Sequence, residues 1–291
     1  MIAVYGKAFD QRCVPVVYRL LEILAKADAD VLMYKPLRDY LSSLPEPISN
    51  MVGVFSGYGD LHPNTRFLLS VGGDGTFLNS IDIIRNSGIP VAGINTGRLG
   101  FLANIAGDHL QESVDKLLAG ELPVEERTLI HATINGQPAD NFPYALNDVV
   151  IQKSNTGFIT IHTWSNNEFL NSYWADGLIV STPAGSSAYS LSVGGPIVAP
   201  ESQIYIISPI AAHNLNVRPL VIPDHTTLKL KAECRNKDEH FTLSLDSRFV
   251  ECISGTEIEL QRADFKVKVV KSGSFYATLR NKLMWGVDKR N

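Results

Sequence analysis

The sequence predicts an α/β domain followed by an all-β domain, and three observations carry this prediction. The chain has 291 residues, of which 45% are hydrophobic and 19% charged, enough for two ordinary domains with buried cores. Up to about residue 124, short apolar runs alternate with stretches of helical spacing, which is typical of a parallel sheet with flanking helices. Beyond that point, segments of alternating apolar and polar residues recur, which is typical of an antiparallel sandwich. We therefore expect an α/β domain at residues 1–124, a β-rich domain at 125–270, and a C-terminal segment, 271–291, that docks back on the first domain.

The N-terminal elements follow from the spacing of apolar residues. In the stretch after the first strand, Val17, Leu20, Leu21 and Leu24 share one helical face. Segment 42–65 contains three prolines and three glycines, so we expect a mobile loop there. The expected strands are 2–7, 30–36, 66–71 and 89–97, and the expected helices are 14–27, 76–86 and 107–121.

The second half is read as a series of strands and hairpins. Asn135-Gly136 is the dipeptide that a two-residue hairpin turn favours. The alternating segments expected to form strands are 158–183, 226–234, 241–253 and 256–263. The tail, residues 274–286, has helical spacing.

Charge and cysteine content exclude several classes of protein. The formal net charge is −4, and the 26 Lys and Arg form no dense run, so we do not expect nucleic acid as the partner. The three cysteines form no CxxC pair and the seven histidines no ligand spacing, so we assign no residue as a metal ligand. No apolar run is long enough to span a membrane, and the first residues are too short for a signal peptide. We expect a soluble, cytoplasmic protein with reduced cysteines and no membrane partner.

The stretch "LLSVGGDGTFLNS", residues 68–80, carries the most chemistry. Glycines between a strand and a helix let backbone N–H groups approach phosphate at the positive end of the helix. Asp74 stands in this turn, where a carboxylate would repel phosphate unless it faced a substrate hydroxyl or a bound Mg²⁺. Both arrangements are usual in phosphoryl transfer to an alcohol. The alternative is that Asp74 only caps the helix, which aspartate does well.

Two further segments are candidates for a nucleotide site. Residues 176–200 are rich in Gly, Ser, Ala and Thr, so backbone can approach a flat or anionic ligand, and Ser186, Ser187 and Tyr189 add hydroxyls. A plain loop has the same composition. Asn147-Asp148 before an apolar strand can read an adenine edge and ribose hydroxyls, although such a pair is more often a turn.

Other local motifs are weaker. Arg98, in a loop with two glycines, can meet phosphate or simply be solvated. The sequence has neither a GxSxG elbow nor a GxxxxGK[ST] loop, which disfavours acyl transfer and P-loop chemistry.

Together these segments make the chain resemble the NAD kinases, which phosphorylate the 2′-hydroxyl of the adenosine ribose of NAD with ATP. The matching stretches follow the family's order and cover most of residues 67–221: "GGDGT" at 72–76, "NTGRLGFL" at 95–102, "LNDVV" at 146–150, "DGLIVSTPAGSSAYSLSVGGPI" at 176–197 and "HNLNVRPLV" at 213–221. The ending "FYATLRNKLMWG" is similar too. The long fourth stretch is much more specific than the glycine turn, which also occurs in lipid kinases.

The resemblance implies a set of roles. Asp74 would be the proton acceptor for the ribose hydroxyl, Gly75 would line the same pocket, and Asn147 and Asp148 would hold adenosine. It also implies ATP as phosphoryl donor, Mg²⁺ or another divalent cation, and a homodimer or homotetramer. The remaining residues that it would place at the dinucleotide or phosphate site, partly across a subunit boundary, are Arg98, Asp176, Ser187, Ala188, Tyr189, Ser190, Leu191 and Ser192.

Three departures from the family pattern concern specificity. Asp148 replaces a frequent Glu, "TPAGSSAY" replaces the frequent "TPTGSTAY", and Arg248 stands where Gln is common.

Two rival functions stay open on sequence alone. A lipid kinase would carry a Gly-Thr-Gly-Asn-Asp type segment where this chain has "INTGRLGF", and a non-catalytic dinucleotide sensor would have no need to keep Asp74.

Overall fold

The computed structural model describes residues 1–7, 13–44, 51–97 and 100–286. Its internal contacts divide the chain into two compact units. Unit 1 contains Met1–Glu126 together with Val267–Asn291, and unit 2 contains Arg127–Lys266. The C-terminal residues from 267 onward therefore belong to the same unit as the N-terminus.

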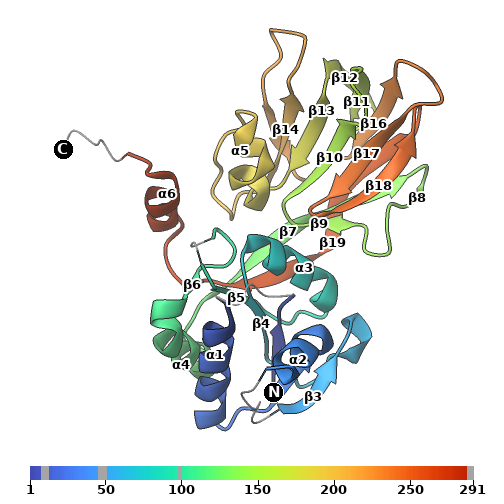
Figure 1. The fold of residues 1–291 in the computed structure, drawn as a ribbon. Helices are drawn as coiled ribbons and strands as arrows, with labels where there is room; N and C mark the ends of the chain where they lie inside the picture. The colour runs from blue at the N-terminus through green and yellow to red at the C-terminus, as the bar shows by residue number, and fades with distance from the viewer. Residues whose placement is uncertain (8–12, 45–50, 98–99, 287–291) are drawn as a thin grey trace. The chain divides into compact units, whose positions relative to one another are not determined.

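Unit 1 is built on a parallel sheet of short strands (Figure 1). Strands β1, β4 and β5 are almost entirely buried. Its strand order is β3-β2-β1-β4-β5, with parallel pairing throughout. On β5, the short β6 pairs with Ile94 and Asn95, and Val269 of β19 (Glu257–Val270) pairs with Val91. The bounds of the other strands are β1 Ile2–Tyr5, β2 Val31–Tyr34, β3 Met51–Phe55, β4 Phe67–Val71, β5 Val91–Asn95 and β6 Ile105–Ala106.

Helices cover both faces of this sheet, as a parallel sheet requires. One apolar cluster joins residues of α1, α2 and α4 to alternate strand residues, including Ala92 and Ile94 of β5. On the opposite face Phe77 of α3 packs so closely on Gly93 that a Cβ at this glycine would lie 2.9 Å from the ring. The helices are α1 Val14–Lys26, α2 Lys35–Ser42, α3 Asp74–Ile84, α4 Leu110–Ala119 and α6 Phe275–Leu283.

The structure corrects the expectation of a loop over residues 42–65. Met51–Phe55 forms β3, which pairs in parallel with β2, and Tyr58–Asp60 forms a short 3₁₀ helix. The helix α2, directly after β2, was not expected either. Residues 45–50 lie outside the described part of the chain.

Unit 2 consists of two largely antiparallel sheets. One contains β12-β11-β16 and the N-terminal part of β19, with β7, β8 and β9 alongside; the other has the order β15-β14-β13-β10-β17-β18. The turn Asn135-Gly136 between β7 and β8 has φ of 49° and 77°, as expected for the predicted hairpin. The bounds are β7 Val124–Ile134, β8 Gln137–Pro138, β9 Tyr144–Ala145, β10 Asp148–Lys153, β11 Ile159–Ser165, β12 Glu168–Ala175, β13 Gly177–Ser181, β14 Ile204–Ile210, β15 Leu220–Pro223, β16 Leu228–Cys234, β17 His240–Leu245 and β18 Arg248–Ile253.

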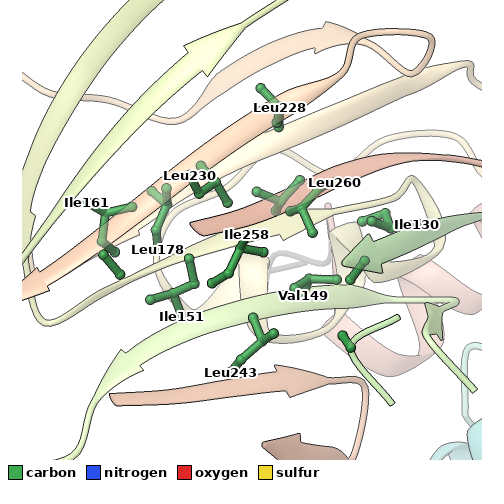
Figure 2. Packing of buried hydrophobic residues seen from close by; sticks show 14 of the residues in the cluster. Ile130, Val149, Ile151, Ile161, Leu178, Leu228, Leu230, Leu243, Ile258 and Leu260 are labelled. Atoms are coloured by element: carbon green, nitrogen blue, oxygen red, sulfur yellow. The ribbon is translucent and has the colours of Figure 1, made fainter. Parts of the chain in front are cut away.

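The two sheets of unit 2 share one hydrophobic core (Figure 2). Ile161, Leu230 and Ile258 from the first sheet meet side chains such as Ile151 and Leu178 from the second. Alternate residues of β16 are buried, which is the pattern of a strand with one face in a core. The predicted fold class, an α/β part followed by an antiparallel sandwich, is confirmed.

Candidate active site

The glycine turn joins β4 to α3 in a conformation that needs its first glycine. Gly72 has φ of 149°, and a Cβ there would lie 2.4 Å from Oγ1 of Thr76. The helix cap is Gly73, and α3 begins with Asp74, whose side chain does not cap it. The first N–H groups of a helix have no partner within the helix, so this end of α3 offers donors to an anion.

The Asp74 carboxylate is held by the loop that follows β5 instead. Its Oδ1 accepts hydrogen bonds from the N–H groups of Leu102, at 3.0 Å, and Ala103, at 2.9 Å. Its Oδ2 accepts one from the Phe101 N–H at 3.0 Å and one from Nζ of Lys282, on α6, at 3.3 Å. The Asp74 side chain is still 30% exposed, so a second molecule can reach it.

Gly100 allows the loop to approach this closely. A Cβ on Gly100 would lie 1.9 Å from Oδ1 of Asp74. Gly97, in the same loop, has open space around its Cβ position, as has Gly75 in α3. The carbonyl of Gly75 accepts a hydrogen bond from the Asn79 amide at 2.8 Å. Arg98, the candidate phosphate contact, lies outside the described residues.

In unit 2 the structure brings together the two segments that the sequence singled out. Strands β10 and β13 are antiparallel neighbours, and Asp148 pairs with Ser181. The Thr182 N–H donates to the carbonyl of Asn147 at 2.9 Å. Gly185 lies so close that a Cβ there would be 2.1 Å from the same carbonyl oxygen. The Asn147-Asp148 pair is therefore the start of a buried strand packed on the small-residue segment.

Both side chains of this pair are buried polar groups. Asn147 is 8% and Asp148 6% exposed. Within the described residues, Oδ1 of Asn147 is buried and accepts no hydrogen bond, which leaves an acceptor suited to a ligand donor. Burial raises the pKa of Asp148 from 3.8 to about 7, and the neighbouring carboxylate of Asp246 adds to the rise.

Residues 187–192 lie at the end of β13 in two short helical turns. Ala184–Ser187 forms a 3₁₀ turn and Tyr189–Ser192 a single α-helical turn, α5. Ser190 is fully buried, and its hydroxyl forms a hydrogen bond with that of Ser208 at 3.1 Å. By contrast, Tyr189 is 37% exposed. The side chains that the surface exposes at least in part are Ser187, Ala188, Tyr189, Leu191 and Ser192.

Asp176 lies at the other end of β13. It forms an ion pair with Lys153 at 2.5 Å, and its N–H donates to the carbonyl of Ile210 at 2.9 Å. Ser181 is five positions further along the chain, roughly 17 Å away along the strand. Within one chain, Asp176 is therefore not grouped with Asp148.

Sequence reasoning missed two residues that contact candidate site residues, one through a side chain and one through the backbone. Lys282 is 208 residues from Asp74, and Asp246 is 99 residues from Asn147, whose N–H it binds. Asp246 lies in a hairpin turn, and because aspartate is common in turns, its presence there does not indicate a long-range contact. The only unusual residue noted near that turn was Arg248, which stands where the family commonly has Gln.

The described parts of the chain contain neither a group of metal ligands nor a membrane-spanning helix. Within residues 1–7, 13–44, 51–97 and 100–286, no group of three or more His, Cys, Asp and Glu is placed to hold a metal ion. Over the same ranges, no helix has the length and apolar content needed to cross a membrane.

Comparison with known proteins gives a consistent result. The ATP-NAD kinase N-terminal domain family matches residues 61–122, and the ATP-NAD kinase C-terminal domain family matches residues 146–272. The NAD kinase of Flavobacterium psychrophilum is 41% identical over 295 residues, covering 100% of this chain and 99% of the relative. That of Cytophaga hutchinsonii is 42% identical over 294 residues and covers 100% of both chains.

Solved structures show the same fold. Yeast NADH kinase, solved with NADH, superposes with a TM-score of 0.85 at 21% identity, covering 99% of this chain and 88% of the yeast chain. An Archaeoglobus fulgidus NAD kinase, solved with ATP, has a TM-score of 0.75 at 24% identity, covering 98% and 99%. With identity above 40% to curated relatives over its full length, this chain belongs to the NAD kinase family, enzymes that use ATP to convert NAD to NADP.

Proposed function

We propose that this chain transfers the γ-phosphoryl group of ATP to the 2′-hydroxyl of the adenosine ribose of NAD, with Asp74 as the base. One observation carries the assignment of the base. A partly exposed carboxylate follows the glycine turn and is fixed by three backbone N–H groups of residues 101–103. A base held in one orientation can meet a substrate hydroxyl at hydrogen-bond distance.

The Lys282 contact sets a condition on this step. A carboxylate has about four acceptor positions, and Phe101, Leu102, Ala103 and Lys282 supply four donors to Asp74. The substrate hydroxyl therefore has to replace the Lys282 ammonium at Oδ2 before its proton can pass to Asp74. The three backbone bonds can persist throughout, since they come from a loop anchored beside β5.

In unit 2, Asn147 and Asp148 are proposed to hold the adenosine part of NAD. The buried Oδ1 of Asn147 suits a donor such as the adenine amino group. The Asp148 carboxyl group, also buried, suits the ribose hydroxyls. Exposed residues among 187–192, and Asp176 of a neighbouring subunit, complete the proposed dinucleotide site.

The divalent cation is proposed to enter with ATP. The described residues form no cluster of three metal ligands, so those residues alone do not make a cage for it. Mg²⁺ commonly keeps several waters and binds through nucleotide phosphates with few protein ligands. When bound, it would reduce the negative charge of the phosphates.

A coupled assay tests the proposed reaction. Purified protein, ATP, Mg²⁺ and NAD are combined with a dehydrogenase specific for NADP, and ADP release is followed in parallel. We expect NADP and ADP in equal amounts and no ADP without NAD. A protein that binds NAD but releases no ADP would be a sensor, and ADP release that needed a lipid alcohol would indicate the rival kinase class.

A further inference from the structure

The hairpin turn between β17 and β18 reaches the segment that carries the proposed adenosine site. Leu245 pairs with Arg248, so Asp246 and Ser247 form a two-residue connection. Asp246 has φ of 52°, in the left-handed region that aspartate tolerates better than most residues. The side chains of Asp246, in this turn, and of Arg248, the first residue of β18, contact residues about a hundred positions earlier in the chain.

The Asp246 carboxylate binds three consecutive backbone N–H groups. Its Oδ2 accepts from Leu146 at 2.9 Å, and its Oδ1 accepts from Asn147 at 2.8 Å and from Asp148 at 3.3 Å. In return, the Asp246 N–H donates to the carbonyl of Asp148 at 3.0 Å. The backbone of both proposed ligand residues is thus fixed by one side chain.

Arg248 binds the stretch of chain just before this segment. Its guanidinium donates from Nη1 to the carbonyl of Phe142 at 2.7 Å and from Nη2 to that of Tyr144. It also lies over the Phe142 ring, 5.0 Å from the centroid, and 3.9 Å from the Asp140 carboxylate. Only a planar group with several donors can bind two carbonyls and stack at once.

We propose that Asp246 and Arg248 are positioning residues that hold residues 142–148 in the conformation in which Asn147 and Asp148 bind the nucleoside. This inference rests on the proposed function of that pair. Neither residue needs to touch NAD, because each acts on the backbone from the side of β17 and β18. Thr182, on the other side, bonds the carbonyls of Leu146 and Asn147, so the segment is held on its donors by Asp246 and on its acceptors by Thr182.

This arrangement also accounts for an arginine at 248. A glutamine is shorter and has one amide nitrogen, so it cannot reproduce the two carbonyl bonds together with stacking on Phe142. In this chain the side chain at 248 is therefore committed to the protein backbone. The residue at 248 therefore affects NAD binding through the conformation of residues 142–148.

The test compares Asp246→Asn with a matched control. Asparagine keeps the size but presents an NH₂ to a backbone donor, so the segment must shift. Displacements of this kind cost about tenfold or more in substrate use. We expect KM for NAD to rise about tenfold, KM for ATP to stay within about twofold, and amides 146–148 to exchange hydrogen faster than in the wild type. Asp224→Asn is the control, because Asp224 is equally a buried carboxylate of unit 2, paired with Arg262 at 3.0 Å.

Arg248→Gln provides a second, independent variant if Asp246→Asn does not fold. It should raise KM for NAD severalfold and accelerate exchange at residues 142–146, while Asp224→Asn changes neither.

Asp148→Ala separates failure of this inference from failure of the proposed site. If Asp148→Ala raises KM for NAD tenfold while the Asp246 and Arg248 variants leave it within twofold, the positioning role is overturned and the site stands. If wild-type protein makes NADP but no variant, Asp148→Ala included, changes KM for NAD, the adenosine assignment itself is overturned, and the positioning role with it.

Discussion

The Asp74 carboxylate combines a structural role with the proposed chemical one, and a single substitution should reveal both. Asp74→Asn removes the base, so we expect kcat to fall at least about 10²-fold while KM for NAD stays within about tenfold. The amide would also face the N–H groups of Leu102 or Phe101, which should cost about 1–3 kcal/mol of stability. Steady-state kinetics and thermal melts measure the two effects separately.

The stability loss marks a difference from the helix-cap interpretation. Asparagine caps helices as well as aspartate does, so a capping Asp74 would tolerate this change without loss. If Asp74→Asn turns over NAD at near the wild-type rate, Asp74 is not the base, and its function is to anchor the loop.

Asp148 should make the stability of the protein depend on pH in an unusual direction. Its pKa is about 7 in the folded protein against 3.8 ordinarily, so between these values the folded state holds a proton that the unfolded state has lost. Stability contributed by this group is therefore present at low pH and falls as pH rises toward 7. Asp148→Asn stays neutral, and we expect it to melt higher than wild type near pH 8, by a margin that shrinks as the pH falls from 7 toward 4.

Melting curves across this pH range, with wild type and Asp148→Asn side by side, check the prediction. Asp246, the neighbouring carboxylate, is present in both proteins, so its titration contributes to both curves. A constant difference in Tm from pH 5 to 8 would show that Asp148 does not titrate in this range.

The loop after β5 should be sensitive to substitution at one glycine and tolerant of it at another. Gly100→Ala places a methyl group 1.9 Å from Oδ1 of Asp74, so either the loop or the carboxylate must move. We expect kcat to fall at least about tenfold, because misplacing a reacting group by an ångström is costly. Gly97→Ala, in open space, should keep near wild-type kinetics. Equal effects from both substitutions would mean that the contact with Asp74 does not set the rate.

How far the sequence predicts each element depends on what holds that element in place. Strand β4 is apolar at four of its five positions because it is buried in the sheet, and an apolar run of this kind is recognised as a strand from the sequence. The edge strand β3 contains Gly53, and the absence of a side chain there makes room for Leu32. Because glycine is typical of loops, the sequence of this segment indicated a loop rather than a strand. The helix α2 has eight residues with a proline near its start, too short for a clear period.

The same reasoning explains which parts of the candidate site could be predicted. Asp74 and the Asn147-Asp148 pair stand at local signals, the end of a strand or the start of one. Lys282 and Asp246 reach these groups from 208 and 99 residues away. Contacts over such separations are created by strand order, and a linear pattern cannot show them. The roles assigned to the candidate residues stay predictions until the variants are measured.

We expect the protein to be a homodimer or homotetramer. Unit 2 exposes large apolar side chains, among them Leu215 at 87% and Phe249 at 77%. Side chains of this kind are common in subunit contacts, although scattered ones also occur on monomers. Light scattering at micromolar concentration should give twice or four times the mass of one chain. A monomer with full activity would remove the inference that Asp176 serves a neighbouring subunit.

The return of residues 267–291 to unit 1 has a consequence for protein synthesis. Val267, Val269 and Val270 are buried in unit 1, and Val269 pairs with Val91 of β5. A ribosome makes the whole of unit 2, residues 127–266, before these valines appear. The nascent chain can therefore complete unit 2 first, while β5 waits with part of its backbone unpaired for a strand made almost two hundred residues later. In the nascent chain, unit 1 is therefore the unit whose translation begins first and whose folding is completed last.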